Sequence, residues 1–144
     1  MLYNRLGDKD EAENLLREVV TAHPELYEIA YSLGLLLAEE KQYDEATLYL
    51  ERAAQGMPER ARVHYNLGVL LDYPQRNSEA EKALLRALEL DPDQIDYLVA
   101  AAEFYLKRKR FPEARRIAEH MIRKHPSNQT GYRILDFIPQ NTSP

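Results

Sequence analysis

Small, apolar and turn-forming residues recur along this 144-residue chain at a fixed spacing of 34 positions. Leu33-Gly34 is followed by Leu67-Gly68 and then by Ala101-Ala102. Two further series keep the same spacing: Glu11-Ala12, Glu45-Ala46, Glu79-Ala80 and Glu113-Ala114, and the prolines Pro24, Pro58, Pro92 and Pro126. Self-similarity at this period is typical of stacked helix–turn–helix units.

Within each unit the pattern predicts two antiparallel helices, an A helix followed by a B helix. Neither helix can bury its apolar face alone, so neighbouring units stack and share a continuous core. Gly34, Gly68 and Ala102 are small where one helix approaches another, and Ala12, Ala46, Ala80 and Ala114 serve the same purpose near the start of each B helix. The predicted A helices cover about 1–6, 25–40, 59–72 and 93–109, the B helices about 9–22, 44–56, 78–90 and 112–124, and a last amphipathic helix 128–138.

One copy of the pattern, residues 27–58, carries a full set of family positions. These are Leu33, Gly34, Leu37, Tyr43, Ala46, Leu50, Ala53 and Pro58. Over roughly residues 1–126 the chain resembles the tetratricopeptide repeat (TPR) family. The resemblance implies an all-α, right-handed solenoid of about 3.5 repeats with a C-terminal capping helix. The implied division is a repeat domain, 1–138, and a polar tail, 139–144; the domain holds a truncated repeat 1–24, repeats 27–58, 61–92 and 95–126, and the capping helix 128–138.

Charge is distributed unevenly along the chain, whose net charge is −5. Residues 1–100 hold 20 acidic and 10 basic residues, whereas residues 101–144 hold 4 and 9. The basic excess includes the run Lys107-Arg108-Lys109-Arg110, which is a solvated turn, a patch for phosphate or an acidic partner, or a nuclear localisation signal. No aromatic residues interleave with it, so a nucleic-acid platform is not expected.

Local motifs for catalysis, metal or cofactor binding are lacking. His120 and His125 lie five residues apart without the HExxH pattern of zinc sites. The five glycines are scattered and form no phosphate-binding loop. We therefore expect no enzyme activity and no cofactor. No stretch of 18 apolar residues predicts a membrane span in this segment. Met1 falls halfway along the first A helix, so we expect the chain to belong to a longer protein, and its compartment is not indicated.

The family resemblance implies that the A helices line a concave face. Seven residues on this face avoid the core, and most of them recur at the repeat spacing. They are candidates for a protein-binding groove: Tyr31, Leu35, Tyr65, Asn66, Val69, Val99 and Glu103. An apolar stripe rimmed by polar groups suits an extended peptide or a partner helix. We therefore expect a non-catalytic scaffold for a protein or peptide partner. The alternatives are a targeting or regulatory segment of a larger enzyme and a self-associating assembly scaffold.

The family's best-known groove site is a carboxylate clamp for acidic chaperone tails, which uses Lys, Arg and Asn on consecutive A helices. Only Asn66 matches that arrangement. The neighbouring sites carry Tyr31, Leu35, Asp96 and Ala100, which supply no cation. The sequence thus disfavours a clamp of this kind.

Overall fold

The computed structural model describes residues 2–72 and 76–140, and within those ranges the chain is helical with no strand. Eight helices follow one another: α1 (Leu2–Ala22), α2 (Tyr27–Glu39), α3 (Tyr43–Gly56), α4 (Ala61–Leu71), α5 (Asn77–Leu90), α6 (Ile95–Lys107), α7 (Phe111–Lys124) and α8 (Thr130–Phe137). The predicted all-α class is confirmed. The predicted tail falls partly on residues 141–144, which lie outside the described ranges.

Helix boundaries repeat at the spacing of the sequence pattern. The A helices α2, α4 and α6 begin at Tyr27, Ala61 and Ile95, and the B helices α3, α5 and α7 begin 16 residues later in each unit. After α2 and α6 the turn passes through Lys41 and Lys109, with φ of 64° and 57°. This left-handed conformation breaks the helix and lets the chain reverse direction.

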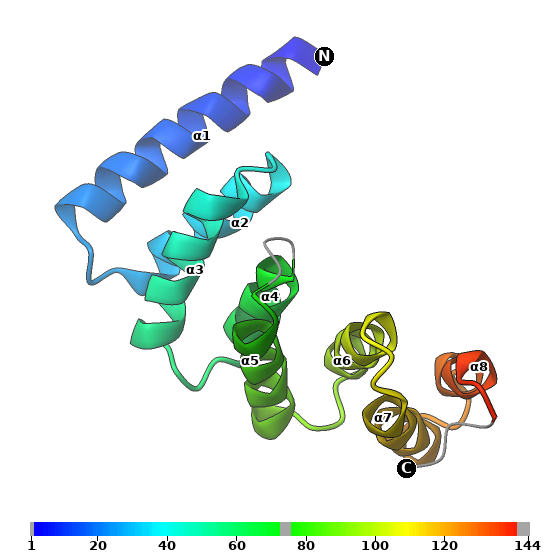
Figure 1. Cartoon of the computed structure of the whole chain (residues 1–144). Helices are drawn as coiled ribbons and strands as arrows, with labels where there is room; N and C mark the ends of the chain where they lie inside the picture. The colour runs from blue at the N-terminus through cyan, green and yellow to red at the C-terminus, as the bar shows by residue number, and fades with distance from the viewer. Residues whose placement is uncertain (1, 73–75, 141–144) are drawn as a thin grey trace.

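The helices pair and stack into a curved array, with α2, α4 and α6 along its inner side and α3, α5 and α7 along the outer side (Figure 1). The small residues of the B helices lie in the contacts: Ala46, Ala80 and Ala114 have no exposed surface. A side chain at Gly34 would meet Leu50 at 2.9 Å, so the close approach of α2 to α3 requires glycine. The small-residue columns are therefore set by helix packing.

The first repeat differs from the prediction. The sequence predicted separate helices over about 1–6 and 9–22, but α1 runs unbroken from Leu2 to Ala22. Gly7 occupies the repeat position of Lys41 and Lys109 yet lacks positive φ. A separate A helix of about six residues would bury little surface, and short isolated helices are only marginally stable. Its packing would not offset the helical hydrogen bonds that a turn at Gly7 would break.

A second correction follows from this continuous helix. Ala12 was predicted to lie in a helix contact, but it is exposed, and Leu15 beside it is 60% exposed. In the part of the chain that the structure describes, no A helix covers this side of α1. The other side packs on the array through buried Val20, and Arg17 pairs with Glu45 of α3 at 2.7 Å.

At the other end, α8 takes the place of a further A helix. It packs on α7 through the buried side chains Ile134 and Ile138. Gly131 allows the close contact, because a Cβ atom there would lie 3.0 Å from the Ala118 carbonyl oxygen. The predicted capping helix is therefore present, two residues shorter at its start and one at its end.

Candidate functional site

The seven groove candidates lie on the three inner helices, and none of them is buried. Tyr31 and Leu35 are on α2, Tyr65, Asn66 and Val69 on α4, and Val99 and Glu103 on α6. Val69 and Glu103 are exposed, and the other five are partly buried. The structure brings these residues together in two contact groups and leaves Leu35 and Val99 packed against the core below them.

The first group centres on an aromatic pair between α4 and α6. The rings of Tyr65 and Tyr97 lie 5.0 Å apart at 33°. The Arg62 guanidinium lies 5.3 Å from the Tyr65 ring and 5.1 Å from the Tyr97 ring, and Nη1 of Arg62 is 3.4 Å from Oδ2 of Asp96. Cation–π attraction and this ion pair hold the Tyr65 ring in place. Burial raises the pKa of Tyr97, and the positive charge of Arg62 partly offsets this increase.

Sequence reasoning missed Arg62, Asp96 and Tyr97 as parts of this group, although one signal was available. Glu28, Arg62 and Asp96 occupy the same repeat position, and their charges alternate. Residues at one repeat position on neighbouring A helices face one another, so opposite charges there indicate pairing across the inner face. Tyr97 gave no such signal, because Val63 and Ile29 hold its position in the other repeats.

Asn66 is more constrained than the sequence suggested. Its amide nitrogen donates to the Tyr31 hydroxyl at 2.7 Å and to the Arg62 carbonyl at 3.0 Å. Both amide hydrogens are therefore used within the protein. The Asn66 carbonyl oxygen remains as an acceptor for a ligand N–H, and the Tyr31 hydroxyl keeps its hydrogen to donate. Burial raises the pKa of Tyr31, and the hydrogen bond from Asn66 partly offsets this increase.

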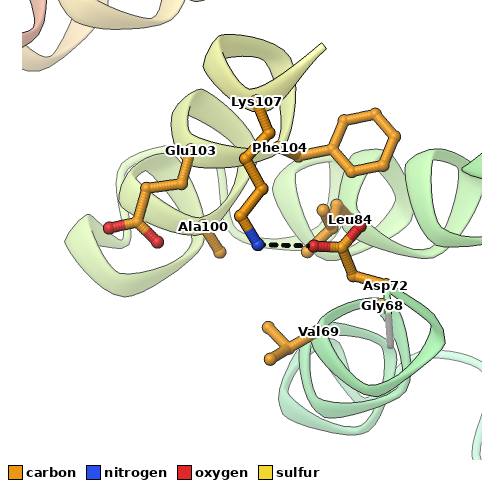
Figure 2. Close-up of a pocket in the computed structure, with 8 residues that line it drawn as sticks. All are labelled: Gly68, Val69, Asp72, Leu84, Ala100, Glu103, Phe104 and Lys107. Atoms are coloured by element: carbon orange, nitrogen blue, oxygen red, sulfur yellow. Dashed lines mark hydrogen bonds and ion pairs between the residues drawn. The ribbon is translucent and has the colours of Figure 1, made fainter. Parts of the chain in front are cut away.

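The second group surrounds a pocket of about 310 Å³ between α4 and α6, shown in Figure 2. Val69 and Glu103, both predicted, line it. Its remaining lining residues were not predicted: Gly68, Asp72, Leu84, Ala100, Phe104 and Lys107. The side chain of Lys107 spans the pocket from α6, and its Nζ donates to Oδ2 of Asp72, directly after α4, at 2.9 Å. The inner face thus has a recess that is lined by both apolar and charged side chains.

The basic run Lys107–Arg110 is largely occupied by contacts within the protein. Arg108 pairs with Asp72 and stacks on the Phe104 ring, with its guanidinium carbon 3.7 Å from the ring centre. Arg110 pairs with Glu81 at 3.0 Å and with Glu113 at 2.7 Å. Stacking therefore places the basic residues of the fourth repeat beside the acidic residues of the third, which disfavours a free anion-binding patch.

The Asp72 ion pairs predict a stability effect that depends on pH. Burial alone would raise the pKa of Asp72, but the hydrogen bonds from Lys107 and Arg108 outweigh it and hold the pKa below its ordinary value. When folding lowers the pKa of a carboxyl group, its charge stabilises the fold at pH values above the unfolded-state pKa. This stabilisation is lost as the pH falls through the folded-state pKa. Asp72→Asn should therefore lower the melting temperature at pH 7, and the difference from wild type should shrink between about pH 5 and pH 2.

Thermal melts of the two proteins across this pH range provide the measurement. Asp136→Asn on α8 is the control, since Asp136 is exposed and has no ion pair among the described residues. A difference between Asp72→Asn and wild type that stays constant with pH would show that the carboxylate charge of Asp72 does not stabilise the fold.

One group of acidic side chains away from the inner face has the spacing of metal ligands. Carboxylate oxygens of Asp10, Glu13 and Glu40 lie within 4.8 Å of one another. Burial and the two neighbouring carboxylates raise the pKa of Glu40. Exposed acidic clusters of this kind are common on protein surfaces, and we assign no function to this one.

Among the described residues, no helix has the length and apolar character needed to cross a bilayer.

Comparison with known proteins identifies the fold. One family model described as tetratricopeptide repeat matches residues 37–100 and again 73–135, and a second with the same description matches residues 2–61. No curated protein sequence matches the chain.

Several solved structures share the array. A crystal structure of MamA has a TM-score of 0.83 at 22% identity, covering 92% of this chain and 77% of that one. YrrB, described as a TPR protein with an unusual peptide-binding site, has a TM-score of 0.80 at 21% identity, covering 94% and 70%. The TPR domain of Arabidopsis OM64 has a TM-score of 0.71 at 17% identity, covering 81% and 97%.

These structural matches show the fold, and the family models extend over most of the chain. TPR proteins are in general non-catalytic modules that bind other proteins or peptides. The repeat spacing, the eight-helix array and both family models agree: this chain belongs to the tetratricopeptide repeat family and has the fold of a protein-interaction scaffold.

Proposed function

We propose that this protein is a non-catalytic scaffold that binds a peptide or partner helix on its inner face. The observation that carries the proposal is the pocket between α4 and α6, whose lining residue Val69 lies one turn after Tyr65 on α4. Val69 at its edge is 41% exposed, although it is apolar. Concave apolar surface with a few fixed polar groups is the usual composition of a binding site.

Two features suit this face to a peptide. The Tyr65 ring is held by Tyr97 and Arg62 before a ligand arrives, so binding loses little side-chain entropy. The Asn66 carbonyl and the Tyr31 hydroxyl offer one acceptor and one donor for a peptide backbone. The similarity to YrrB, a TPR protein with an unusual peptide-binding site, supports the same class of ligand.

The proposal predicts that Tyr65→Ala weakens binding. Aromatic anchors at the centre of an interface cost about 2 kcal/mol or more when truncated, which is roughly a 30-fold loss of affinity. The ligands for this test are peptides selected on the wild-type protein from a displayed library of random dodecapeptides. Their dissociation constants are measured by fluorescence anisotropy for wild type and variants, with helicity checked by circular dichroism.

Tyr49→Ala provides a matched control. Tyr49 lies on the outer helix α3, is partly buried and also carries an arginine, Arg52, 5.2 Å from its ring centre. The Tyr49→Ala variant should bind the peptides with nearly unchanged affinity, and so should Lys109→Ala in the basic turn. If the basic-turn variant abolishes binding and Tyr65→Ala does not, the ligand occupies the charged edge and the inner-face proposal is wrong.

Self-association is a second candidate, favoured by the open side of α1. Ala12 and Leu15 are exposed there, whereas Ala46, Ala80 and Ala114 at the repeat position of Ala12 are completely covered. A helix from a second copy could cover this side as an A helix covers the later B helices. Sedimentation at several concentrations distinguishes the two candidates, because only self-association makes the mass depend on concentration.

A further inference from the structure

Two carboxylates, Asp72 and Glu103, and two cations, Lys107 and Arg108, lie around the inner-face pocket, but they are unevenly paired. The Asp72 carboxylate is neutralised by Lys107 at 2.9 Å and by Arg108. Glu103 is exposed on the opposite edge and has no ion pair or hydrogen bond to any of the described residues. Lys107 lies one turn further along α6, yet it points across the pocket to Asp72 and away from Glu103 (Figure 2). One carboxylate at the mouth therefore lacks a counter-charge.

The rest of the pocket surface is apolar or small. Val69 and Leu84 form one side, and Ala100 and Phe104 form the other. Gly68 is fixed by packing, because a Cβ atom there would meet Cγ of Leu84 at 2.8 Å. The recess therefore accepts an aliphatic side chain, and Glu103, a lining carboxylate without an ion pair among the described residues, attracts a cation.

Neighbouring charged groups of the inner face do not alter this balance. Arg62 pairs with Asp96 at 3.4 Å and also covers the two tyrosine rings. Arg60 pairs with Glu28 at the end of the face formed by α2 and α4. These cations are engaged, and Lys107 and Arg108 are both paired with Asp72, so an acidic peptide must compete for a paired cation, whereas a basic peptide finds Glu103 unpaired among the described residues.

We infer, on the basis of the proposed function, that the ligand is a peptide segment of a partner protein with an aliphatic side chain close to a lysine or arginine. The aliphatic side chain enters the pocket and the cation pairs with Glu103. Ala100 and Glu103 are separated by one helical turn, about 5 Å along α6. An extended peptide advances about 3.3 Å per residue, so the two ligand residues lie within two positions of each other.

The test is a selection of random displayed dodecapeptides on wild type and, separately, on Glu103→Lys. Wild type should enrich peptides with a lysine or arginine within two residues of an aliphatic residue. Glu103→Lys should weaken the selected wild-type peptide by roughly threefold to tenfold, the range for an exposed ion pair turned into a repulsion. Changing the peptide's basic residue to glutamate should restore binding to Glu103→Lys while weakening binding to wild type.

Two further variants separate charge from shape. Ala100→Leu should fill the pocket and remove the preference for the aliphatic residue, with helicity retained. Glu119→Lys is the matched charge control, because Glu119 is exposed on the outer helix α7. It should leave the affinity unchanged. Raising the salt concentration should weaken wild-type binding more than binding to Glu103→Gln, since exposed charges are screened.

The outcomes distinguish this inference from the proposal on which it rests. The inference is overturned, and inner-face binding stands, if the selected peptides lose affinity for Tyr65→Ala but lack a basic residue. The same holds if they bind Glu103→Lys as tightly as they bind wild type. If neither Tyr65→Ala nor Ala100→Leu weakens any selected peptide, inner-face binding is wrong and the inference is overturned with it.

Discussion

Leu50→Ala is expected to lower the free energy of unfolding by about 2–5 kcal/mol, the largest effect of any single substitution considered. Leu50 is 1% exposed on α3 and packs against Gly34 of α2. Truncation removes its burial and leaves a cavity at the contact between the two helices. Leu48→Ala in the same helix is the control, because Leu48 is 50% exposed and should cost little.

A second substitution should partly rescue this loss. A Cβ atom at Gly34 would meet Cγ and Cδ2 of Leu50 at 2.9 Å and the Ala46 carbonyl oxygen at 3.3 Å. Gly34→Ala should therefore destabilise the wild-type protein. In the Leu50→Ala protein the clash with the leucine is gone, and alanine gains about 1 kcal/mol over glycine in a helix interior. It also fills part of the cavity.

The chain itself supports this compensation. Gly34 and Leu50 are matched by Gly68 and Leu84 in the next repeat, whereas the following repeat has Ala102 and Ala118, both fully buried. Urea denaturation of the two single variants and the double variant gives the coupling energy, which we expect to be about 0.5–3 kcal/mol. Additive effects would show that the two positions pack independently.

Ala80→Leu should lower the free energy of unfolding by about 1–3 kcal/mol, because a fully buried alanine leaves no room for three more carbon atoms. Ala80 has no exposed surface and lies in the first turns of α5, within the core. The added side chain would force shifts in the packing around this helix. The urea midpoint at unchanged slope is the measurement.

Ala54→Leu is the matched control for this overpacking. Ala54 is partly buried on α3 and lines an open groove of about 660 Å³ on the outer side, together with Leu67, Leu71 and Leu85. A leucine there can extend into the groove, so stability should change little. An equal loss of stability in both variants would contradict the assignment of Ala80 to a closely packed contact.

The sequence alone was sufficient to predict the helices of the repeats. Their starts recur every 34 residues because the patterns that place them, such as Glu45-Ala46 and the proline after each B helix, are local. Helix formation and termination depend on residues within a few positions along the chain. Small positions such as Gly68 and Ala80 could be assigned to contacts for the same reason, since they recur in phase.

The first repeat shows where local pattern was insufficient. Gly7 has the residue type suited to a reversing turn and occupies the repeat position of Lys41 and Lys109, yet α1 continues through it. The turn forms only where a full-length A helix can pack on its B helix, and this tertiary gain is absent in the first repeat. Ala12 is exposed for the same reason.

The sequence also determined which helices carry the candidate site, because the repeat phase separates inner from core positions. Only the tertiary structure decided which side chains meet across the inner face. Three contacts join different repeats: Arg62 with Tyr97, the Asn66 amide with the Tyr31 hydroxyl, and Lys107 with Asp72. These contacts depend on the angle and spacing at which neighbouring A helices stack, and that geometry is set by packing throughout the array.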